Sequence, residues 1–344
     1  MSPKNLNVLN KTHRDLLNQL KDKRLSQIYK KFESSLKLKE NFIIAVSGGQ
    51  DSLALSFLAK IYSIKNSLSA KYIHVNHKLR QNSSLEAKLT KKILKKNSIN
   101  LDVLNWNGVK PTNNIQSIAR KNRYRLLGSA AKKLKINNIL TAHHLDDLYE
   151  NFFIRIVRGS GLSGLVSLDK KTYYDGLILI RPLLNFEKED LTYITNKYFS
   201  SYVDDPSNDD NKFTRVRIRK LIKNLQSEGL DKKKIFLTIK NLKYSNQTSK
   251  YYVLKNLKEN SFYFKRKNCI LLKKDFFSQS REVVFRSLEE VIKLVGRKYY
   301  AVRGKKVDKI IDLNCNINKP SFKVTLGNCI IKKVNNSIIV SKEQ

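Results

Sequence analysis

The chain has 344 residues, and its 68 Lys and Arg against 29 Asp and Glu give a formal net charge of +39. Such an excess favours a polyanionic partner, because each Lys or Arg that contacts a phosphate releases bound counterions. No apolar run of about 18 residues is present, and the amino terminus lacks an apolar core with a cleavage site, so we expect neither a transmembrane helix nor a signal peptide.

Cysteine usage bounds the chemistry further. Cys269, Cys315 and Cys329 all lie in the last quarter of the chain and form no CxxC pair. This spacing argues against a zinc ribbon, an iron–sulfur site or a thiol relay, and it suits a reduced cytoplasm.

The first 38 residues are rich in Lys and Leu and are expected to form short amphipathic helices. From about 41 to 185, apolar strand-like runs alternate with longer segments of helical spacing. Strands separated by single helices pair in parallel through right-handed crossovers. We therefore predict an α/β fold with a doubly wound, Rossmann-like parallel sheet, whose ligands gather at the carboxyl ends of the strands. The predicted strands are 42–46, 71–75, 101–104, 138–142 and 177–181, and the predicted helices are 51–65, 83–96, 114–134 and 144–158.

After residue 185 the pattern changes. A polar loop at 204–211 precedes the alternating sequence RVRIRK, and residues 231–258 form a basic segment of helical character. The remainder mixes short β-rich runs with one helical stretch near 281–295, which indicates a small α+β domain. The predicted organisation is a helical extension (1–38), a doubly wound domain (39–225), a basic helical connector (226–258) and a small α+β domain (259–344).

The sequence SGGQDS, at 47–52, joins the first predicted strand to the first helix. Adjacent glycines let backbone amides approach an anion at a helix amino terminus, Ser47 and Ser52 supply hydroxyls, and Asp51 suits Mg²⁺. The loop lacks the Lys of a Walker A motif and the spacing of GxGxxG. An ordinary glycine turn is the alternative. The full order of residues resembles the pyrophosphate loop of the N-type ATP pyrophosphatases.

Two further motifs are basic, and the first of them lies at the ligand-facing edge of the predicted sheet. His77 and Arg80 follow the second strand, and Arg120 and Arg123 share one helix face at a spacing of three. A pair of guanidinium groups suits phosphate oxygens. A histidine satisfied by its neighbours and a solvated helix face are the corresponding alternatives.

The sequence TAHHLDDLYE, at 141–150, closes the fourth strand and opens a helix. If the helix begins near His143, then His143, Asp147 and Glu150 share a face, while Asp146 points elsewhere and is expected to act as an amino-terminal cap or as a partner of the helix dipole. The order is not that of a HExxH metal site. The cluster suits an ammonium group or Mg²⁺ on ATP, with a capped surface helix as the alternative.

Six motifs in order resemble the tRNA(Ile)-lysidine synthase family: SGGQDS, HVNHKLR, ARKNRY, TAHHLDDLYEN, RGSGLSGL and IRPLL. The polar loop with RVRIR resembles a further segment of that family, and VTLGNC at 324–329 weakly resembles its TLGGC element. Asn151 stands where the family usually has Thr, and Val216 replaces a frequent Asn. These departures affect details of the site, and the reaction implied by the resemblance stays the same.

The resemblance implies a ligase that joins lysine to C2 of the wobble cytidine, position 34, of tRNA(Ile) with a CAU anticodon. ATP would adenylate the cytidine O2 with loss of pyrophosphate, and the ε-amine of free L-lysine would then displace AMP, which changes decoding from AUG to AUA. The implied co-substrate is ATP with Mg²⁺, the implied location is the cytoplasm, and a homodimer is left open. Residues 39–225 would be the ATP-pyrophosphatase catalytic domain and 259–344 a tRNA-binding domain.

The resemblance also implies roles for individual residues. The ATP- and pyrophosphate-binding set is Ser47, Gly48, Gly49, Gln50, Asp51 and Ser52, with Asp51 on Mg²⁺. The catalytic set is Asp51, Arg120, Arg123, Asp147 and Glu150, and the lysine-binding set is His143, Asp147 and Glu150. The tRNA-binding set is His77, Arg80, Arg158, Arg215, Arg217 and Arg219, the last three on one face if their segment is extended.

Three other functions compete with this interpretation. A tRNA cytidine 2-thiolation enzyme of the same superfamily generally uses cysteine pairs, and none lies in the catalytic half. An amidotransferase-type synthetase needs a glutaminase nucleophile, and no early cysteine is present. A non-catalytic basic RNA-binding protein has no use for clustered acids next to an anion-binding loop.

Overall fold

The computed structural model describes residues 13–80, 82–109, 111, 113, 115–204, 210–265, 268–297, 302, 304–315 and 321–343. Parts of two predicted segments, 1–12 of the helical extension and 205–209 of the polar loop, lie outside these residues. The chain divides into two compact units, Met1–Phe236 and Leu237–Gln344. The boundary falls inside helix α10 (Lys232–Asn260), and each unit is described by itself.

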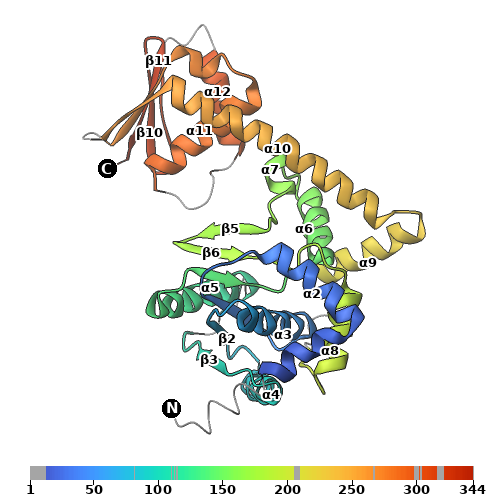
Figure 1. Ribbon diagram of the computed structural model, residues 1–344. Helices are drawn as coiled ribbons and strands as arrows, with labels where there is room; N and C mark the ends of the chain where they lie inside the picture. Colours follow the sequence, from blue (N-terminus) through green and yellow to red (C-terminus); the bar gives the residue numbers. More distant parts are fainter. Residues whose placement is uncertain are drawn as a thin grey trace. The chain divides into compact units, whose positions relative to one another are not determined.

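A six-stranded sheet in the order β3-β2-β1-β4-β6-β5 forms the centre of the first unit (Figure 1). Five strands are parallel, as predicted, and the edge strand β5 runs antiparallel to β6, which was not predicted. The chain order reverses between β1 and β4, so a crevice opens there at the carboxyl ends of the strands. The strands are β1 (Phe42–Val46), β2 (Ala70–Asn76), β3 (Leu101–Asn105), β4 (Asn138–Leu140), β5 (Lys171–Tyr174) and β6 (Leu177–Ile180).

Strand β1 is apolar throughout because both of its faces are buried. Phe42 and Ile44 belong to a core that includes side chains of helices α2, α3, α4 and α8, whereas Ile43 belongs to a second core with α5. The doubly wound architecture predicted from the alternating pattern is confirmed. The helices are α2 (Lys23–Leu36), α3 (Gln50–Lys65), α4 (Ser83–Lys96), α5 (Ile115–Leu134) and α8 (Lys188–Tyr198), with a short 3-10 helix η1 (Gln19–Lys21).

Helix α6 (Leu145–Val157) follows β4 and packs against α9 (Thr214–Ser227), and α7 (Leu162–Leu165) is a single short turn between them in sequence. Two points that the sequence left open are decided here. The alternating RVRIR segment is helical rather than extended, with Val216, Ile218 and Ile222 buried on α9, so the condition for a shared face of the three arginines is not met. The cap of α6 is His144, whose ring nitrogen accepts a hydrogen bond from the backbone N–H of Asp146, so Asp146 is not the cap but an acid in the first turn of the helix.

The second unit contains a five-stranded antiparallel sheet in the order β7-β8-β11-β10-β9, which confirms the predicted small α+β fold (Figure 1). Helices α11 (Arg281–Val295) and α12 (Gly304–Cys315) share a core with one face of this sheet. The strands are β7 (Ser261–Phe264), β8 (Cys269–Leu272), β9 (Lys323–Leu326), β10 (Cys329–Val334) and β11 (Ser337–Lys342), and a 3-10 helix η4 (Lys274–Phe277) follows β8.

The VTLGNC segment forms the tight turn from β9 to β10, with positive φ at both Gly327 and Asn328. A Cβ added at Gly296, at the end of α11, would lie 2.0 Å from the carbonyl oxygen of Gly327, so the two backbones touch. The segment therefore has a packing role in this unit. Among the described helices of the whole chain, none is long and apolar enough to cross a bilayer.

Candidate active site

The phosphate loop, residues 47–52, turns sharply between β1 and α3. Gly48 has a φ of 98°, and a Cβ there would lie 2.4 Å from Oγ1 of Thr90 on α4. The Ser52 hydroxyl accepts a hydrogen bond from the backbone N–H of Gly48 at 3.0 Å and donates to the carbonyl of Gly49 at 2.9 Å. The loop is thus held in shape by its own side chain, in front of the amino terminus of α3, where an anion is stabilised.

Asp51 lies at the start of α3 and contacts two basic groups from distant parts of the chain. Lys188 Nζ donates to its Oδ1 at 2.5 Å, and His144 Nε2 lies 3.6 Å from its Oδ2. Burial raises the pKa of Asp51, but His144 and Lys188 outweigh that effect and lower the pKa below its usual value. Burial lowers the pKa of His144, but Asp51 and Asp147 raise it overall. Asp51 is therefore held as a carboxylate, paired with Lys188 and close to the His144 ring.

Sequence reasoning missed both partners of Asp51. Lys188 is 137 residues away in the chain, and no local pattern connects it to the loop. His144 is next to His143, which the sequence analysis selected. The helix begins at Leu145, one or two residues later than assumed, and this position makes His144 the cap. The available signal for His144 was its place just before LDD, where a side-chain acceptor caps a helix.

Asp147 and Glu150, here called the acid pair, lie at the start of α6 and face α9. Asp147 Oδ2 accepts the backbone N–H of His144 at 3.0 Å, which completes a capping box. Arg215 Nη1 lies 3.6 Å from Asp147 Oδ1, and Arg219 Nε lies 2.5 Å from Glu150 Oε1. Burial raises the pKa of Glu150 above its usual value even though Arg219 lowers it. The structure thus brings the predicted acids together with two of the predicted tRNA-binding arginines.

A cavity of about 200 Å³, the loop cavity, lies between the phosphate loop and Asp147 of the acid pair, whereas Glu150 lines a separate cavity. His143 lines it and its Nδ1 lies 3.0 Å from Thr141 Oγ1. Burial lowers the pKa of His143 to about 4, so its ring is neutral at pH 7. A neutral ring can accept a proton or a hydrogen bond, but it adds no positive charge. The lining residues are Ala45, Ser47, Gly49, Asp51, Ser52, Arg123, Tyr124, Leu127, Thr141, Ala142, His143, Asp147 and Arg215.

Arg123 on α5 points into the loop cavity and donates from Nε to Nε2 of His77 at 3.4 Å. Burial, followed by the charge of Arg123, lowers the pKa of His77 to about 4. His77 is therefore a neutral acceptor that orients Arg123. Arg120, one turn earlier, lies with its guanidinium carbon 5.0 Å from the centre of the Tyr124 ring. The structure places Arg123, but not Arg120, among the residues that line the cavity.

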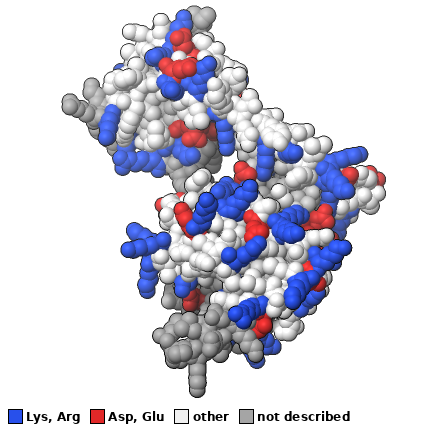
Figure 2. All heavy atoms as spheres, in the orientation of Figure 1, with Lys and Arg blue, Asp and Glu red and all other residues white. Residues whose placement is uncertain are grey.

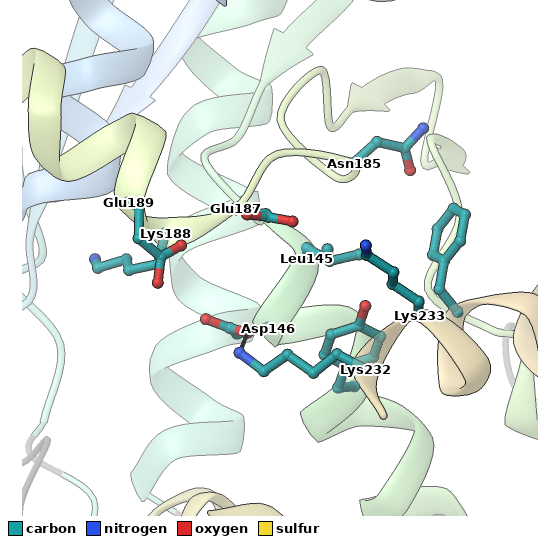
Figure 3. A pocket seen from close by; sticks show the side chains of 10 residues that line it. Leu145, Asp146, Asn185, Glu187, Lys188, Glu189, Lys232 and Lys233 are labelled. Atoms are coloured by element: carbon teal, nitrogen blue, oxygen red, sulfur yellow. Dashed lines mark hydrogen bonds and ion pairs between the residues drawn. The ribbon is translucent and has the colours of Figure 1, made fainter. Parts of the chain in front are cut away.

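Two larger cavities are both lined by Asp146. One of about 440 Å³ is lined by Glu150, Arg219 and Lys232, and one of about 500 Å³ by Glu187, Lys188 and Lys232, among others. Figure 3 shows Lys232 reaching Asp146 across the second cavity, and Lys232 Nζ lies 2.9 Å from Asp146 Oδ1. Every acid at the start of α6 therefore has a basic partner supplied by α9 or α10.

Three of the predicted tRNA-binding residues lie away from these cavities. Arg80 pairs with Glu86 at 3.0 Å on the surface, and Arg158 is the exposed carboxyl cap of α6, about 12–16 Å along the helix from the acid pair. Arg217 points away from the acid pair and donates to the carbonyls of Asn211 and Lys212. None of the cavities described above is lined by these three side chains.

The donor set fits Mg²⁺ only together with a nucleotide. Within the described ranges, no group of three or more His, Cys, Asp and Glu side chains is arranged to hold a metal ion. Mg²⁺ at nucleotide sites is typically held by one or two carboxylates plus phosphate oxygens. Asp51 at the phosphate loop supplies such a carboxylate.

Comparison with known proteins gives the class first. A family model described as the PP-loop domain matches residues 17–225, so this chain contains a PP-loop domain. A U34-tRNA thiolase from Methanococcus maripaludis has a similar fold, with a TM-score of 0.54 at 18% identity over 64% of this chain and 79% of that one. At this identity the likeness concerns the fold alone.

Curated relatives narrow the class. The tRNA(Ile)-lysidine synthase of Orientia tsutsugamushi is 33% identical over 323 residues, 91% of this chain and 71% of that relative. That of Wolbachia pipientis wMel is 31% identical over 87% of this chain and 70% of its own. That of Rhodopseudomonas palustris is 40% identical over 191 residues, and this match spans about half, 55%, of each chain. The chain belongs to the tRNA(Ile)-lysidine synthase family, as its motifs predicted.

Proposed function

We propose that this protein ligates lysine to C2 of the wobble cytidine of tRNA(Ile) with a CAU anticodon, with ATP as co-substrate. The observation that carries the proposal is the loop cavity, which the anion-binding loop and Asp147 of the acid pair line together. A phosphate loop alone serves many nucleotide enzymes. A carboxylate pair beside it adds a place for a cationic second substrate, which the ammonium of lysine fits.

In the first step, the cytidine O2 attacks the α-phosphorus of ATP, and pyrophosphate leaves with the electrons of the broken P–O bond. The backbone of Gly48 and Gly49 and the amino terminus of α3 would hold the pyrophosphate. Arg123 would offset charge that develops on the α-phosphate, and Arg120 would add to the positive field nearby. Asp51 would hold Mg²⁺, which neutralises phosphate charge when it is bound.

In the second step, the ε-amine of lysine attacks C2, the bond from C2 to O2 breaks, and AMP leaves with that oxygen. The attacking nitrogen must lose a proton, because lysine enters as an ammonium ion. Asp147 and Glu150 would hold this ammonium, and a carboxylate of the pair would accept the proton as the bond forms. His143, neutral at pH 7, would be a supporting acceptor in the same cavity.

The cytidine must leave the anticodon stack to reach this cavity, as chemistry on a base usually requires. The charge excess of the chain supports an RNA substrate, and Figure 2 shows Lys and Arg side chains spread over the visible face of both units. Exposed Arg80, Arg158 and Arg217 are proposed to contact the RNA backbone. We propose that the enzyme works in the cytoplasm.

We propose that the second unit contacts RNA through the outer face of its sheet. The strand register places Phe262, Leu271, Ile339, Lys332 and Lys323 in one row across all five strands. The neighbouring row, which includes Ile270, Val340 and Ile331, faces the helices instead. The outer row holds an exposed aromatic ring and two lysines, and no carboxylate.

Such a face suits unpaired nucleotides, because bases stack on aromatic rings and lysines neutralise the phosphates. Phe264 lies on the same face, with its ring centre 5.1 Å from that of Phe262. Replacing both by Ala should weaken tRNA binding by at least about tenfold, since one stacked base is worth about 1–3 kcal/mol. The paired control is Tyr251→Ala, an exposed aromatic on α10. Unchanged tRNA affinity in the double variant would exclude this face.

Cytidine 2-thiolation is the competing activity within the PP-loop class. All three cysteines lie in the second unit, and Cys269 and Cys329 are buried there. No thiol therefore lines the loop cavity, where a sulfur carrier would have to reach the activated C2. Ligation of lysine uses the groups that do line it.

The direct test incubates the purified full chain with ATP, Mg²⁺, radiolabelled lysine and a CAU-anticodon tRNA(Ile) transcript. Stable incorporation of label, together with release of one pyrophosphate and one AMP, is the expected result. A transcript with a substituted wobble base is the control and should stay unlabelled. Absence of incorporation with active, ATP-binding protein would refute the proposal.

A further inference from the structure

The two oxygens of the Glu150 carboxylate have different surroundings. Oε1 accepts a close hydrogen bond from Arg219 Nε, at 2.5 Å. Oε2 is buried and has no hydrogen-bond donor in the described part of the protein, although the whole residue is only 3% exposed. A buried carboxylate oxygen without a donor is costly, so this atom marks a place where a donor is missing.

Arg215 lies beside that place without filling it. Its Nε is 4.0 Å from Glu150 Oε2 and its Nη1 is 3.6 Å from Asp147 Oδ1, both beyond hydrogen-bonding distance. Its side chain is 47% exposed, so the attraction is screened and weak. Arg215 also lines the loop cavity with Arg123, whose positive charge repels it.

We infer that Arg215 is an internal stand-in for the ammonium group of the substrate lysine, and that Arg219 is a positioning residue that holds Glu150 ready to receive it. This inference rests on the proposed function. Arg215 would leave the acid pair when a phosphate group enters the loop cavity or lies along α9. Lysine would then bind between Glu150 Oε2 and Asp147 Oδ1.

The shapes of the two cations support the exchange. A guanidinium is planar and its donors point in fixed directions, whereas an ammonium is compact and its three donors rotate freely. Arg215, anchored on α9, stops at ion-pair distance from both acids. An ammonium on a free lysine can approach both oxygens to about 2.8 Å and supply the missing donor.

Arg219, unlike Arg215, contacts Glu150 directly and changes the charge state of its carboxyl. It makes a charge-assisted hydrogen bond to Glu150, and it opposes the burial that raises the pKa of that carboxyl. Without Arg219, Glu150 would take up a proton more readily and lose its attraction for an ammonium. Arg219 therefore acts through Glu150, whereas Arg215 competes with the substrate.

The exchange couples the two substrates, because lysine and phosphate would favour the same displaced state of Arg215. Lysine should therefore bind weakly to the free protein and more tightly once phosphate is bound. The phosphate could belong to ATP or to RNA, and both share the chemistry that attracts a guanidinium. Lysine would therefore occupy its site mainly when a phosphate-bearing substrate is already bound.

The test measures binding of radiolabelled lysine to the full chain by equilibrium dialysis, without reaction. Arg215→Gln should bind lysine about fivefold more tightly than the wild type in the absence of phosphate ligands, the factor that matches an exposed ion pair of about 1 kcal/mol. Arg219→Gln should bind it about tenfold more weakly, and Arg219→Lys should recover most of that loss. Arg125→Gln, an exposed arginine on α5 that lines none of the three cavities, is the control and should leave lysine affinity unchanged.

Four arms then identify the phosphate source: no addition, a non-cleavable ATP analogue, the tRNA transcript, and both. The wild type should gain lysine affinity in at least one arm, and Arg215→Gln should gain less in that arm. If the wild type binds lysine but both Arg215→Gln and Arg215→Ala bind it no better without phosphate, the stand-in is refuted and the proposed function survives. If no arm gives lysine binding, both the inference and the proposed function fail.

Discussion

Replacing Gly48 by Ala tests the backbone conformation of the phosphate loop and its close contact with α4. Two separate penalties arise from this single methyl group. The backbone at Gly48 has a φ of 98°, which an L side chain rarely adopts, and the new Cβ would lie 2.4 Å from Thr90 Oγ1. The loop also cannot move away freely, because the Gly48 carbonyl accepts the N–H of Val203 at 3.0 Å.

The magnitude follows from the sum of the two penalties. The left-handed backbone contributes about 1–2 kcal/mol, and a methyl group inserted into a packed region contributes about 1–3 kcal/mol. Gly48→Ala should therefore lower the free energy of unfolding of the first unit by about 2–5 kcal/mol. In the double variant with Thr90→Ala, the overlap disappears and the backbone penalty stays, so about half of the loss should return.

The assay uses urea unfolding followed by tryptophan fluorescence. The sequence has one tryptophan, and Trp106 is buried at the end of β3, so its signal reports on the first unit. Binding of ATP to the folded variant is measured in parallel and should weaken, because the amides of the loop change direction. A loss of less than about 0.5 kcal/mol, the range of ordinary surface changes, would refute the described loop geometry.

Three further outcomes are expected. Asp51→Ala should abolish pyrophosphate release, measured with a coupled assay, while tRNA affinity stays nearly unchanged; a strong loss of tRNA affinity would mean that the loop is misassigned. Protonation of His77, whose folded pKa of about 4 lies below its usual 6.5, is favoured in the unfolded state. Its contribution to stability should thus be complete above pH 6.5 and be lost as pH falls toward 4, so His77→Gln should flatten the decline of the urea midpoint over that range, and an equally steep decline would contradict it. Gly296→Ala should unfold the second unit at lower urea, monitored by circular dichroism, while the Trp106 signal keeps its midpoint; a shift in both signals would show that the units do not respond separately.

Much of the first unit was predictable because its strands are buried on both faces and its helices are long. The run FIIAV in β1 has no competing interpretation, and the glycines at 48–49 mark the end of the strand. The edge strand β5 was missed because KTYY is only partly buried and has little apolar pattern. Its neighbour β6 supplies the hydrogen bonds that make it a strand.

The candidate site was predictable only where its chemistry is local in sequence. Asp147 and Glu150 are one turn apart, so their shared face could be inferred from spacing alone. Lys188 could not, because its contact with Asp51 depends on how α8 packs over α3. The conformation of the RVRIR segment could not be decided from the motif, because an alternation over five residues fits a strand, whereas its helical pattern needs Ile222, beyond the motif, to become visible.

The contact between Gly296 and Gly327 has a consequence for how this chain can vary. These positions are 31 residues apart, and each has its own reason to lack a side chain: a Cβ at Gly296 would meet the Gly327 carbonyl, whereas Gly327 has a φ of 66° and a Cβ there would meet Ile292 and Val302. No substitution at position 327 can make room for a side chain at position 296, because the obstacle there is a backbone oxygen. A short glycine-containing motif can therefore be required by packing alone, without any share in chemistry.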